Sequence, residues 1–439
     1  MIRVGVIGVG TVGRSVVKIL EENAEIITAR AGDTITVKRG VVRNLEKARD
    51  LKLELSQNPD DIINDPEIDI VVELMGGVEE PFRILKSALA SGKAVVTANK
   101  ALLAYHRYEL QEIAGDIPFE FEASVAGGIP IISALRDGLS ANHILSIMGI
   151  MNGTCNYMLT KMMNEGIDFD SILAEAQRLG YAEADPTFDI GGFDAAHKLL
   201  ILASIAYGID AKPEDILIEG IEGITQEDIS FAKEFGYTIK LLGIAKRDGA
   251  EVELRVHAAL VKKDAMIGKI DGVMNGISVV GDRVGETLYY GPGAGGDATA
   301  SAVVANIIDI VRSGKRSPML GFNHPLEEGL RLKPSGNILS KYYLRLRISD
   351  KPGMLAKITQ LFADHTISVE AMLQRPYEEQ CAHLLFSTHE ALESNVCEMI
   401  KELELLDAVL LSWMRGTKFA QGKASFWIKS DYSYHKRLL

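Results

Sequence analysis

The chain has 439 residues, 47% of them hydrophobic and 24% charged, which is enough for two or three globular domains. Its 60 acidic and 47 basic residues give a net charge of −13, which argues against nucleic acid as a partner. Three cysteines with no paired spacing indicate a reducing compartment, and no apolar run approaches the roughly twenty residues that a membrane span needs. The first strand begins at Ile2 and leaves no room for a signal peptide, so we expect a cytoplasmic protein.

The amino-terminal stretch has the pattern of a dinucleotide-binding fold. A short apolar strand, Ile2–Ile7, runs into a glycine turn and then into a helix that extends to Glu22. In this fingerprint the first glycine makes the turn, the second admits the pyrophosphate, and the third allows close helix packing. The predicted cofactor contacts here are Gly8, Gly10, Thr11, Val12 and Gly13, and further strands of an open parallel sheet are predicted at 34–42, 68–74 and 94–97.

The end of the second strand should select between the two nicotinamide dinucleotides. An acid there binds the free ribose hydroxyls of NAD, whereas cations accept the 2′-phosphate of NADP. The strand ends at Arg43 and Asn44, with Lys47 and Arg49 just beyond, so the sequence favours NADP. Glu46 lies close enough to keep NAD possible.

A lysine follows the strand at 94–97. The carboxyl ends of strands in an open parallel sheet face the ligand crevice, so Lys100 is expected to point towards the nicotinamide. Asn99 and Lys100 are therefore further predicted cofactor contacts. The alternative is a surface lysine that opens a helix.

The stretch 180–198 combines four carboxylates with one lysine, directly before the apolar run 199–207. Asp194 and Lys198 are four residues apart, so their side chains rise from one face of a helix. An ordinary surface pair is the alternative, but the apolar helix favours a partly buried, partnered ammonium. Such a lysine can donate a proton to a developing alkoxide.

This stretch also carries a family resemblance. The sequence Gly-Tyr-Ala-Glu-x-Asp-Pro at 180–186, followed by Asp-x-x-Gly-x-Asp-Ala-x-x-Lys at 189–198, resembles the signature of homoserine dehydrogenases. The resemblance implies NAD(P)-dependent interconversion of L-aspartate 4-semialdehyde and L-homoserine in threonine and methionine biosynthesis, by a homo-oligomer, dimer or tetramer. It implies Lys198, Lys100 and Asp194 as catalytic residues and places Glu183 against both substrate and cofactor.

A polar turn follows the predicted strand 144–150 and caps a helix. Asn152 and Thr154 could hold a substrate carboxylate at this helix start, or they could simply cap it. The turn resembles the amino-acid pocket of the same family. The substrate-binding residues expected in full are Glu183, Asp189, Asn152, Gly153, Thr154 and Tyr181.

Two loops carry glycines between predicted elements. Residues 119–131 begin as a strand that breaks at paired glycines, and carbonyls plus a carboxylate suit a hard cation, although a plain domain crossover is the alternative. The resemblance implies a monovalent cation there, sodium in the first place, with Glu122, Val125, Gly127 and Ile129 as ligands. Residues 289–299 precede an apolar helix at 300–311 and resemble the family's second cofactor loop, with Gly291 and Gly293; a hinge is the alternative.

The carboxyl-terminal part predicts a βαββαβ unit of the ferredoxin-like kind. Its strands are expected at 342–348, 367–374, 381–388 and 408–413, with helices after Asp350 and at 392–403. Asp-Lys-Pro-Gly-x-Leu at 350–355 resembles ACT domains, which implies feedback inhibition by threonine. The expected contacts are Asp350, Gly353, Met354, Leu355 and Gln374.

We therefore expect an α/β protein with a Rossmann-type dinucleotide-binding domain, a mixed-sheet α+β catalytic and dimerisation domain, and a ferredoxin-like ACT domain. The boundaries are 1–131 with 298–320 returning to it, 132–297, a linker at 321–340, 341–415 for the ACT-like domain, and a basic tail at 416–439. Two alternatives remain. A phosphorylating semialdehyde dehydrogenase would use Cys155 as its nucleophile, for which no histidine partner is evident, and a non-catalytic amino-acid sensor would have kept only the fold.

Overall fold

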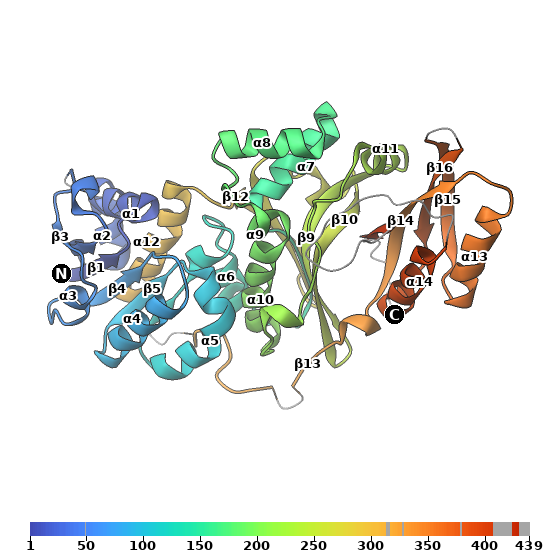
Figure 1. Cartoon of the computed structure of the whole chain (residues 1–439). Coiled ribbons are helices and arrows are strands. Elements are labelled where there is room, and N and C mark those ends of the chain that lie inside the picture. Colours follow the sequence, from blue (N-terminus) through green and yellow to red (C-terminus); the bar gives the residue numbers. More distant parts are fainter. Residues whose placement is uncertain (49, 313–316, 327–328, 378–379, 407–423, 430–439) are drawn as a thin grey trace. The chain divides into compact units, whose positions relative to one another are not determined.

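The computed structural model describes residues 1–48, 50–312, 317–326, 329–377, 380–406 and 424–429 (Figure 1). The chain divides into two compact units. Unit 1 comprises Met1–Ile147, His197–Pro213 and Asn275–Leu330, and unit 2 comprises Met148–Ala196, Glu214–Met274 and Arg331–Leu439.

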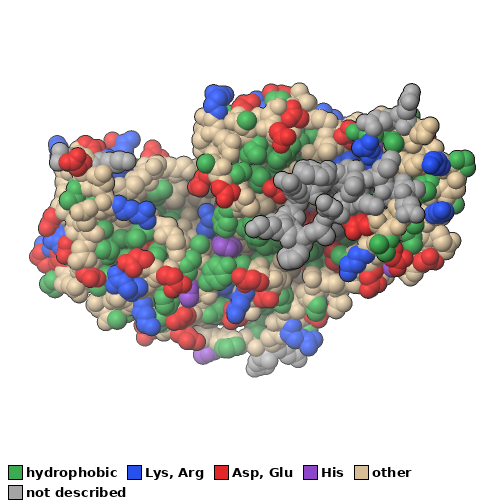
Figure 2. All heavy atoms as spheres, viewed as in Figure 1, with side chains coloured by type: hydrophobic (Ala, Val, Ile, Leu, Met, Phe, Trp, Pro, Cys, Tyr) green, Lys and Arg blue, Asp and Glu red, His purple; other side chains and the backbone are tan. Residues whose placement is uncertain are grey.

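On the face drawn in Figure 2, acidic and basic side chains are interspersed. No helix among the described residues is long and apolar enough to cross a membrane.

Unit 1 is built on a six-stranded parallel sheet in the order β3-β2-β1-β4-β5-β6. This 3-2-1-4-5-6 order is that of the doubly wound dinucleotide-binding folds, so the predicted Rossmann-type fold is confirmed. The central strands are continuous apolar runs because both faces of the sheet are covered. The strands are β1 (Ile2–Ile7), β2 (Ile35–Val41), β3 (Glu54–Ser56), β4 (Ile70–Glu73), β5 (Ala94–Thr97) and β6 (Phe119–Glu120).

Helices cover both faces of this sheet. One face shares a hydrophobic core with α1 (Thr11–Glu22), α2 (Ala24–Ala31) and α12 (Gly296–Arg312), so a helix from late in the chain packs beside α1. Gly5 of β1 points to the opposite face, where its Cβ position is filled by Ile62 of α3. That face carries α3 (Asp60–Ile63), α4 (Glu79–Ala90) and α5 (Lys100–Ala114).

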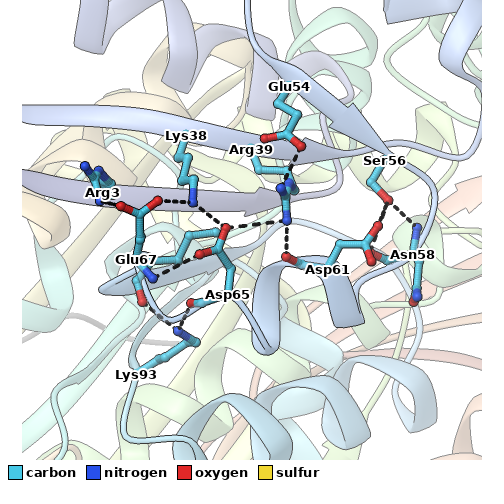
Figure 3. Close-up of polar contacts among 11 residues, drawn as sticks. Arg3, Lys38, Arg39, Glu54, Ser56, Asn58, Asp61, Asp65, Glu67 and Lys93 are labelled. Carbon is cyan, nitrogen blue, oxygen red and sulfur yellow. Dashed lines mark hydrogen bonds and ion pairs between the residues drawn. The ribbon is translucent and has the colours of Figure 1, made fainter.

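A network of ion pairs fastens the amino-terminal ends of the strands (Figure 3). Lys38 of β2 donates to Asp65 at 2.6 Å and to Glu67 at 2.7 Å, just before β4. Lys93, which precedes β5, donates to the backbone oxygen atoms of Asp65 and Ile68 at 2.6 and 2.7 Å. The Lys38 ammonium holds the pKa of the Asp65 carboxyl below its usual range. The network lies at the end of the sheet away from the carboxyl ends of the strands, so its role is structural.

Unit 1 also joins α5 to α10 (Phe193–Tyr207) through a buried arginine. Arg107 of α5 donates to Ser204 Oγ and to the Ala211 carbonyl, each at 2.6 Å. The rings of Tyr105 and His197 meet edge to face at 5.7 Å. The remaining elements are α6 (Ile131–Ser133), β7 (Ile144–Ile150), β11 (Met274–Gly281) and β12 (Gly285–Pro292). The glycine-rich stretch 289–299 thus begins as the end of β12, which the sequence analysis did not predict.

Unit 2 contains a long antiparallel hairpin, β9 (Tyr237–Asp248) and β10 (Glu251–Lys262). Its two-residue turn is possible because Gly249 takes a φ of 60°, which an L side chain rarely adopts. Helices α7 and α11 pack on β9. The other elements of this part are α7 (Gly153–Glu165), α8 (Phe169–Arg178), α9 (Thr187–Ile190), β8 (Leu217–Ile218), α11 (Gln226–Glu234) and β13 (Arg331–Leu332).

The carboxyl-terminal part of unit 2 is a sheet in the order β18-β14-β16-β15, with each neighbouring pair antiparallel. Helices α13 and α14 share a core with it, which confirms the predicted ferredoxin-like fold. The strand predicted at 408–413 lies outside the described residues, and β18 comes from the predicted tail. The elements are β14 (Leu339–Ser349), α13 (Met354–Asp364), β15 (Val369–Pro376), β16 (Cys381–Thr388), β17 (Ala391–Leu392), α14 (Glu393–Glu404) and β18 (Ala424–Lys429).

A buried ion pair docks this sheet onto α11. The Asp228 carboxylate accepts from Arg345 Nε at 2.8 Å and from the Tyr343 hydroxyl at 2.9 Å. It also accepts from the backbone N–H and the hydroxyl of Thr225 at 2.9 and 3.0 Å, which closes a capping box at the start of α11. The Asp228 and Arg345 side chains are 1% and 3% exposed. The ring of Phe231 packs on that of Tyr343 with 4.7 Å between centroids.

Candidate active site

The three glycines between β1 and α1 take the three different roles that the fingerprint predicts. Gly8 has a φ of 97°, and a Cβ atom on it would lie 2.6 Å from the Leu74 carbonyl oxygen. A Cβ atom on Gly13 would lie 2.6 Å from the Gly8 carbonyl oxygen. Gly10 has open space at its Cβ position, as a residue facing a bound pyrophosphate needs.

A cleft of about 840 Å³ lies at the carboxyl ends of the first strands of the parallel sheet. Arg43 and Asn44 line it, as predicted for the end of β2. Thr11 and Val12 form the first turn of α1. Sequence reasoning missed Arg14, which also lines the cleft and pairs with Asp50 at 2.6 Å. A cation directly after the third glycine was the signal that could have found it.

The two predicted loops touch each other within unit 1. Gly128 N–H donates to the Pro292 carbonyl at 3.2 Å, and a Cβ atom on Gly127 would lie 2.7 Å from the Gly293 carbonyl oxygen. A Cβ atom on Gly291 would meet the Ile129 side chain at 3.2 Å. Beyond the loop, Ser15 of α1 donates to the Asp297 carboxylate at 2.7 Å, which ties the loop to the glycine-turn helix.

Glu122 is buried and its carboxylate caps α6. Oε1 accepts from Ile132 N–H at 2.7 Å, while Oε2 accepts from Ser133 N–H at 2.9 Å and from the Ser133 hydroxyl. Burial raises the pKa of this carboxyl. Ala126 and Gly127 both have positive φ, at 54° and 55°. Within the described part of the chain, no three His, Cys, Asp or Glu side chains are grouped to hold a metal ion.

The two predicted catalytic lysines lie on the helices that Arg107 joins. Asn99 caps α5 by accepting from Leu102 N–H at 3.1 Å, and Lys100 is the first residue of that helix. Lys198 lies on α10 beside His197, whose ring contacts Tyr105 of α5. Both lysines are partly buried in the structure.

Unit 2 brings three predicted substrate and catalytic residues together. Asn152 Nδ2 donates to Asp189 at 2.8 Å and to Asp194 at 3.0 Å, and Asp194 is buried. The Asn152 Oδ1 atom accepts from Cys155 N–H at 2.8 Å and so caps α7, which begins at Gly153. Asn152 therefore caps the helix, which was one of its two predicted roles, and its side chain also binds two carboxylates of the protein itself; the predicted contact with a substrate carboxylate stays a prediction.

The other predicted substrate residues lie on α7 and in the segment between α8 and α9. Thr154 Oγ1 donates to the Tyr181 carbonyl at 2.6 Å, and Gln177 holds the Glu183 carbonyl at 3.1 Å. The Glu183 side chain and the Tyr181 side chain are exposed. Cys155 is fully buried and its thiol donates to the Asp189 carbonyl at 3.3 Å, so it packs rather than meeting a substrate. This burial disfavours the alternative with Cys155 as a nucleophile.

The predicted regulatory turn is also assembled in unit 2. Gln374 of β15 donates to the Asp350 carboxylate at 3.2 Å. Gly353 precedes α13 with a φ of 87°, Met354 is buried, and Leu355 is half-buried. Residues predicted from two separate segments therefore meet at this strand-helix turn.

The fold, the glycine turn and the cleft define the class: a protein with a Rossmann-type dinucleotide-binding domain. Comparisons with known proteins give the family. Family models match for "Homoserine dehydrogenase, NAD binding domain" at residues 8–116, "Homoserine dehydrogenase" at 130–308 and "ACT domain" at 342–404. A homoserine dehydrogenase of Helicobacter pylori is 56% identical over 410 residues, which cover 93% of this chain and 97% of that protein. The chain belongs to the homoserine dehydrogenase family.

Solved structures agree with this assignment. A homoserine dehydrogenase from Thiobacillus denitrificans is 46% identical, with a TM-score of 0.89 and 98% of both chains covered. A hyperthermophilic archaeal homoserine dehydrogenase, determined in complex with NADPH, is 27% identical with a TM-score of 0.60. The match covers 70% of this chain and 96% of the archaeal chain.

Proposed function

We propose that Lys198 is the proton donor to the substrate oxygen when L-aspartate 4-semialdehyde is reduced to L-homoserine, and the proton acceptor in the reverse direction. The bound dinucleotide supplies or takes up the hydride. Charge then develops on the former aldehyde oxygen, and an ammonium group can both stabilise and protonate it. The observation that supports this role is the position of Lys198 on α10, beside the helix that carries Lys100.

Lys100 polarises the same oxygen in this proposal, and Asp194 orients Lys198 from four residues earlier on α10. Asp189 and Glu183 hold the ammonium group or the hydroxyl of the amino acid. Asn152, Gly153, Thr154 and Tyr181 are the further substrate-binding residues of this proposal, and Asn152 already donates to Asp189 and Asp194. The division into domains given above stays a prediction.

Steady-state kinetics of Lys198→Ala test the central role. A lost general acid should lower kcat by roughly 10²- to 10⁴-fold. Lys18→Ala is the matched control, because Lys18 is an exposed lysine of α1 whose Nζ lies 4.0 Å from Glu22. The proposal fails if a folded Lys198→Ala enzyme keeps the kcat of the wild type.

NADP is the preferred cofactor in this proposal. Arg43 and Asn44 line the cleft at the end of β2, and neither can bind ribose hydroxyls as an acid would. The archaeal relative crystallised with NADPH points the same way. Arg43→Ala should raise KM for NADP several-fold and leave KM for NAD unchanged; equal changes with both cofactors would contradict the assignment.

A monovalent cation, with sodium as the first candidate, fits the loop at Glu122. The loop combines the buried Glu122 carboxylate with the carbonyls of Val125, Gly127 and Ile129, which are oxygen donors of the kind that hard cations take. Ile129's carbonyl accepts from Ile131 N–H and keeps a second lone pair. Melting temperatures in sodium, potassium and N-methylglucamine chloride at equal ionic strength test the site, with Glu122→Gln as the variant that should remove any difference.

Threonine is the proposed effector, bound at the turn of Asp350, Gly353, Met354, Leu355 and Gln374. Threonine at several millimolar should inhibit the enzyme and raise its melting temperature, and Asp350→Ala should reduce both effects. A homo-oligomer, dimer or tetramer, and a cytoplasmic location stay predictions; sedimentation and cell fractionation decide them.

A further inference from the structure

Glu73 is a buried acid that the reaction described above does not use. It is the last residue of β4 and is 0% exposed. In the sheet it pairs with Ile7 of β1 on one side and with Thr97 of β5 on the other. A carboxyl group in such a place must be held by hydrogen bonds, because burial without them is costly.

Hydrogen bonds link this carboxylate into a closed circuit. Glu73 Oε2 accepts from the Thr97 hydroxyl at 2.6 Å, and Thr97 Oγ1 in turn accepts from Asn99 N–H at 3.0 Å. Asn99 Nδ2 donates to the Gly77 carbonyl at 2.9 Å. The circuit returns through the backbone to Met75, whose N–H donates to Glu73 Oε1 at 2.6 Å.

The circuit holds two functional segments at once. Met75 and Gly76 line the cofactor cleft, so one side of the circuit is a wall of that cleft. Asn99 also caps α5 through its Oδ1, and Lys100 follows it directly. A shift of the Glu73 carboxylate would therefore move the cleft wall and the start of the lysine-bearing helix together.

Ionisation of Glu73 completes the circuit. Both of its oxygens act as acceptors, which suits the carboxylate better than the acid. The groups packed against it from β1, β5 and the start of α5 are Ile7, Thr97 and Asn99, and none of them carries a charge. Burial raises the pKa of Glu73 to about 7, against which the hydrogen bonds from Thr97, Met75 and the Asn99 side chain act.

We propose that Glu73 is a positioning residue, which acts through Thr97 and Asn99 to align the cofactor cleft with Lys100. The proposal deepens the proposed function, since it rests on the role given there to Lys100. The Thr97 hydroxyl is the tested link, because it donates to the Glu73 carboxylate and accepts from Asn99 N–H. Misplacement of a reacting group by about 1 Å can cost roughly 100-fold in rate, so a loosened circuit should be visible in kcat.

Glu73→Gln, Thr97→Val and the double variant form the test, with Thr97→Ser as the matched control. Valine keeps the shape of threonine without the hydroxyl, whereas serine keeps the hydroxyl. We expect Glu73→Gln and Thr97→Val each to lower kcat by roughly 10- to 100-fold, with KM for homoserine changed less than about threefold. The double variant should resemble either single one, because both break the same circuit. Thr97→Ser should behave as the wild type.

The pH profile gives a second readout. A step in kcat near pH 7, with activity higher on the alkaline side, should be present in the wild type and absent in Glu73→Gln. If Glu73→Gln does not fold, Thr97→Val carries the test. Wild-type kcat in folded Glu73→Gln or Thr97→Val, or effects that multiply in the double variant, would overturn the proposal.

Failure of the role proposed for Lys100 can be distinguished from failure of the proposal for Glu73. Lys100→Ala with wild-type kcat would remove that role alone. The Kd for NADPH, measured by fluorescence titration of Thr97→Val, would then still decide whether the circuit shapes the cleft. A raised Kd supports that part, and an unchanged Kd overturns it.

Discussion

The junction between the ACT domain and α11 should depend on one carboxylate. Asp228→Asn removes the carboxylate that accepts from Arg345 Nε at 2.8 Å, in a place where the two side chains are 1% and 3% exposed. Breaking a buried ion pair by removing one partner typically costs about 3–5 kcal/mol, because the other charge stays buried. We therefore expect a local loss of about that size at the junction.

Glu234→Gln is the matched control for this loss. Glu234 lies on the same helix and pairs with Arg375 of β15, so it also bridges α11 and the ACT domain. Their side chains, however, are 48% and 39% exposed, and such pairs contribute about 0–1 kcal/mol. The comparison separates the effect of burial from the effect of bridging the two parts.

Hydrogen exchange of peptides from α11 and β14 is the assay, because global melting of a multidomain protein does not give a single free energy. A loss of 3–5 kcal/mol corresponds to roughly 10²- to 10⁴-fold faster exchange where opening of the junction governs it. Glu234→Gln should accelerate exchange by less than about tenfold. Equal protection in the two variants would refute the view that burial decides the strength of this junction.

Three further predictions concern unit 1 and the substrate turn. Gly13→Ala should destabilise the protein in thermal melts, because its Cβ atom would lie 2.6 Å from a carbonyl oxygen. Gly10→Ala should fold normally, and fluorescence titration should show a Kd for NADPH raised about tenfold. Asp65→Asn should lower Tm at pH 7 by about 2–4 °C. The Asp65 pKa is depressed in the folded protein, so this stabilisation is present above its unfolded pKa and is lost as pH falls through the lower folded value. The variant and the wild type should therefore converge only below about pH 4, the ordinary pKa of an aspartate carboxyl. Asn152→Ala should raise KM for homoserine without changing KM for NADPH, because two carboxylates lose their shared donor; an unchanged KM for homoserine would contradict this.

Local patterns predicted the fold well because most elements have one dominant signal. The strand, glycine turn and helix at the amino terminus, the apolar helix after Asp194 and the alternating strand before Asp350 all formed as predicted. Short elements were different. The strand predicted from Phe119 ends after two residues, since the chain turns into the loop capped by Glu122.

The contacts that join distant segments could not be predicted from the sequence. In β14 the alternation of Leu344, Arg345 and Leu346 predicts that Arg345 faces solvent, yet α11 covers that face and Asp228 receives it. The pattern Thr225-x-x-Asp228 indicates a capping box, but nothing in it indicates a partner 117 residues away. Glu73 was passed over for the same reason, since its role depends on Thr97 in the neighbouring strand.

The two ends of the parallel sheet meet different electrostatic demands. At the amino-terminal ends, Lys38, Asp65 and Glu67 stay fully charged near solvent, where opposite charges pair at little cost in desolvation (Figure 3). At the carboxyl ends Met75 and Gly76 line the cleft, and Glu73 lies fully buried beside them. Burial raises the pKa of Glu73 to about 7, and its carboxylate is held by the uncharged donors Thr97 and Met75. Substitutions of Lys38, Asp65 or Glu67 should therefore change stability and leave KM unaltered. Substitutions of Glu73 should change kcat while the fold persists.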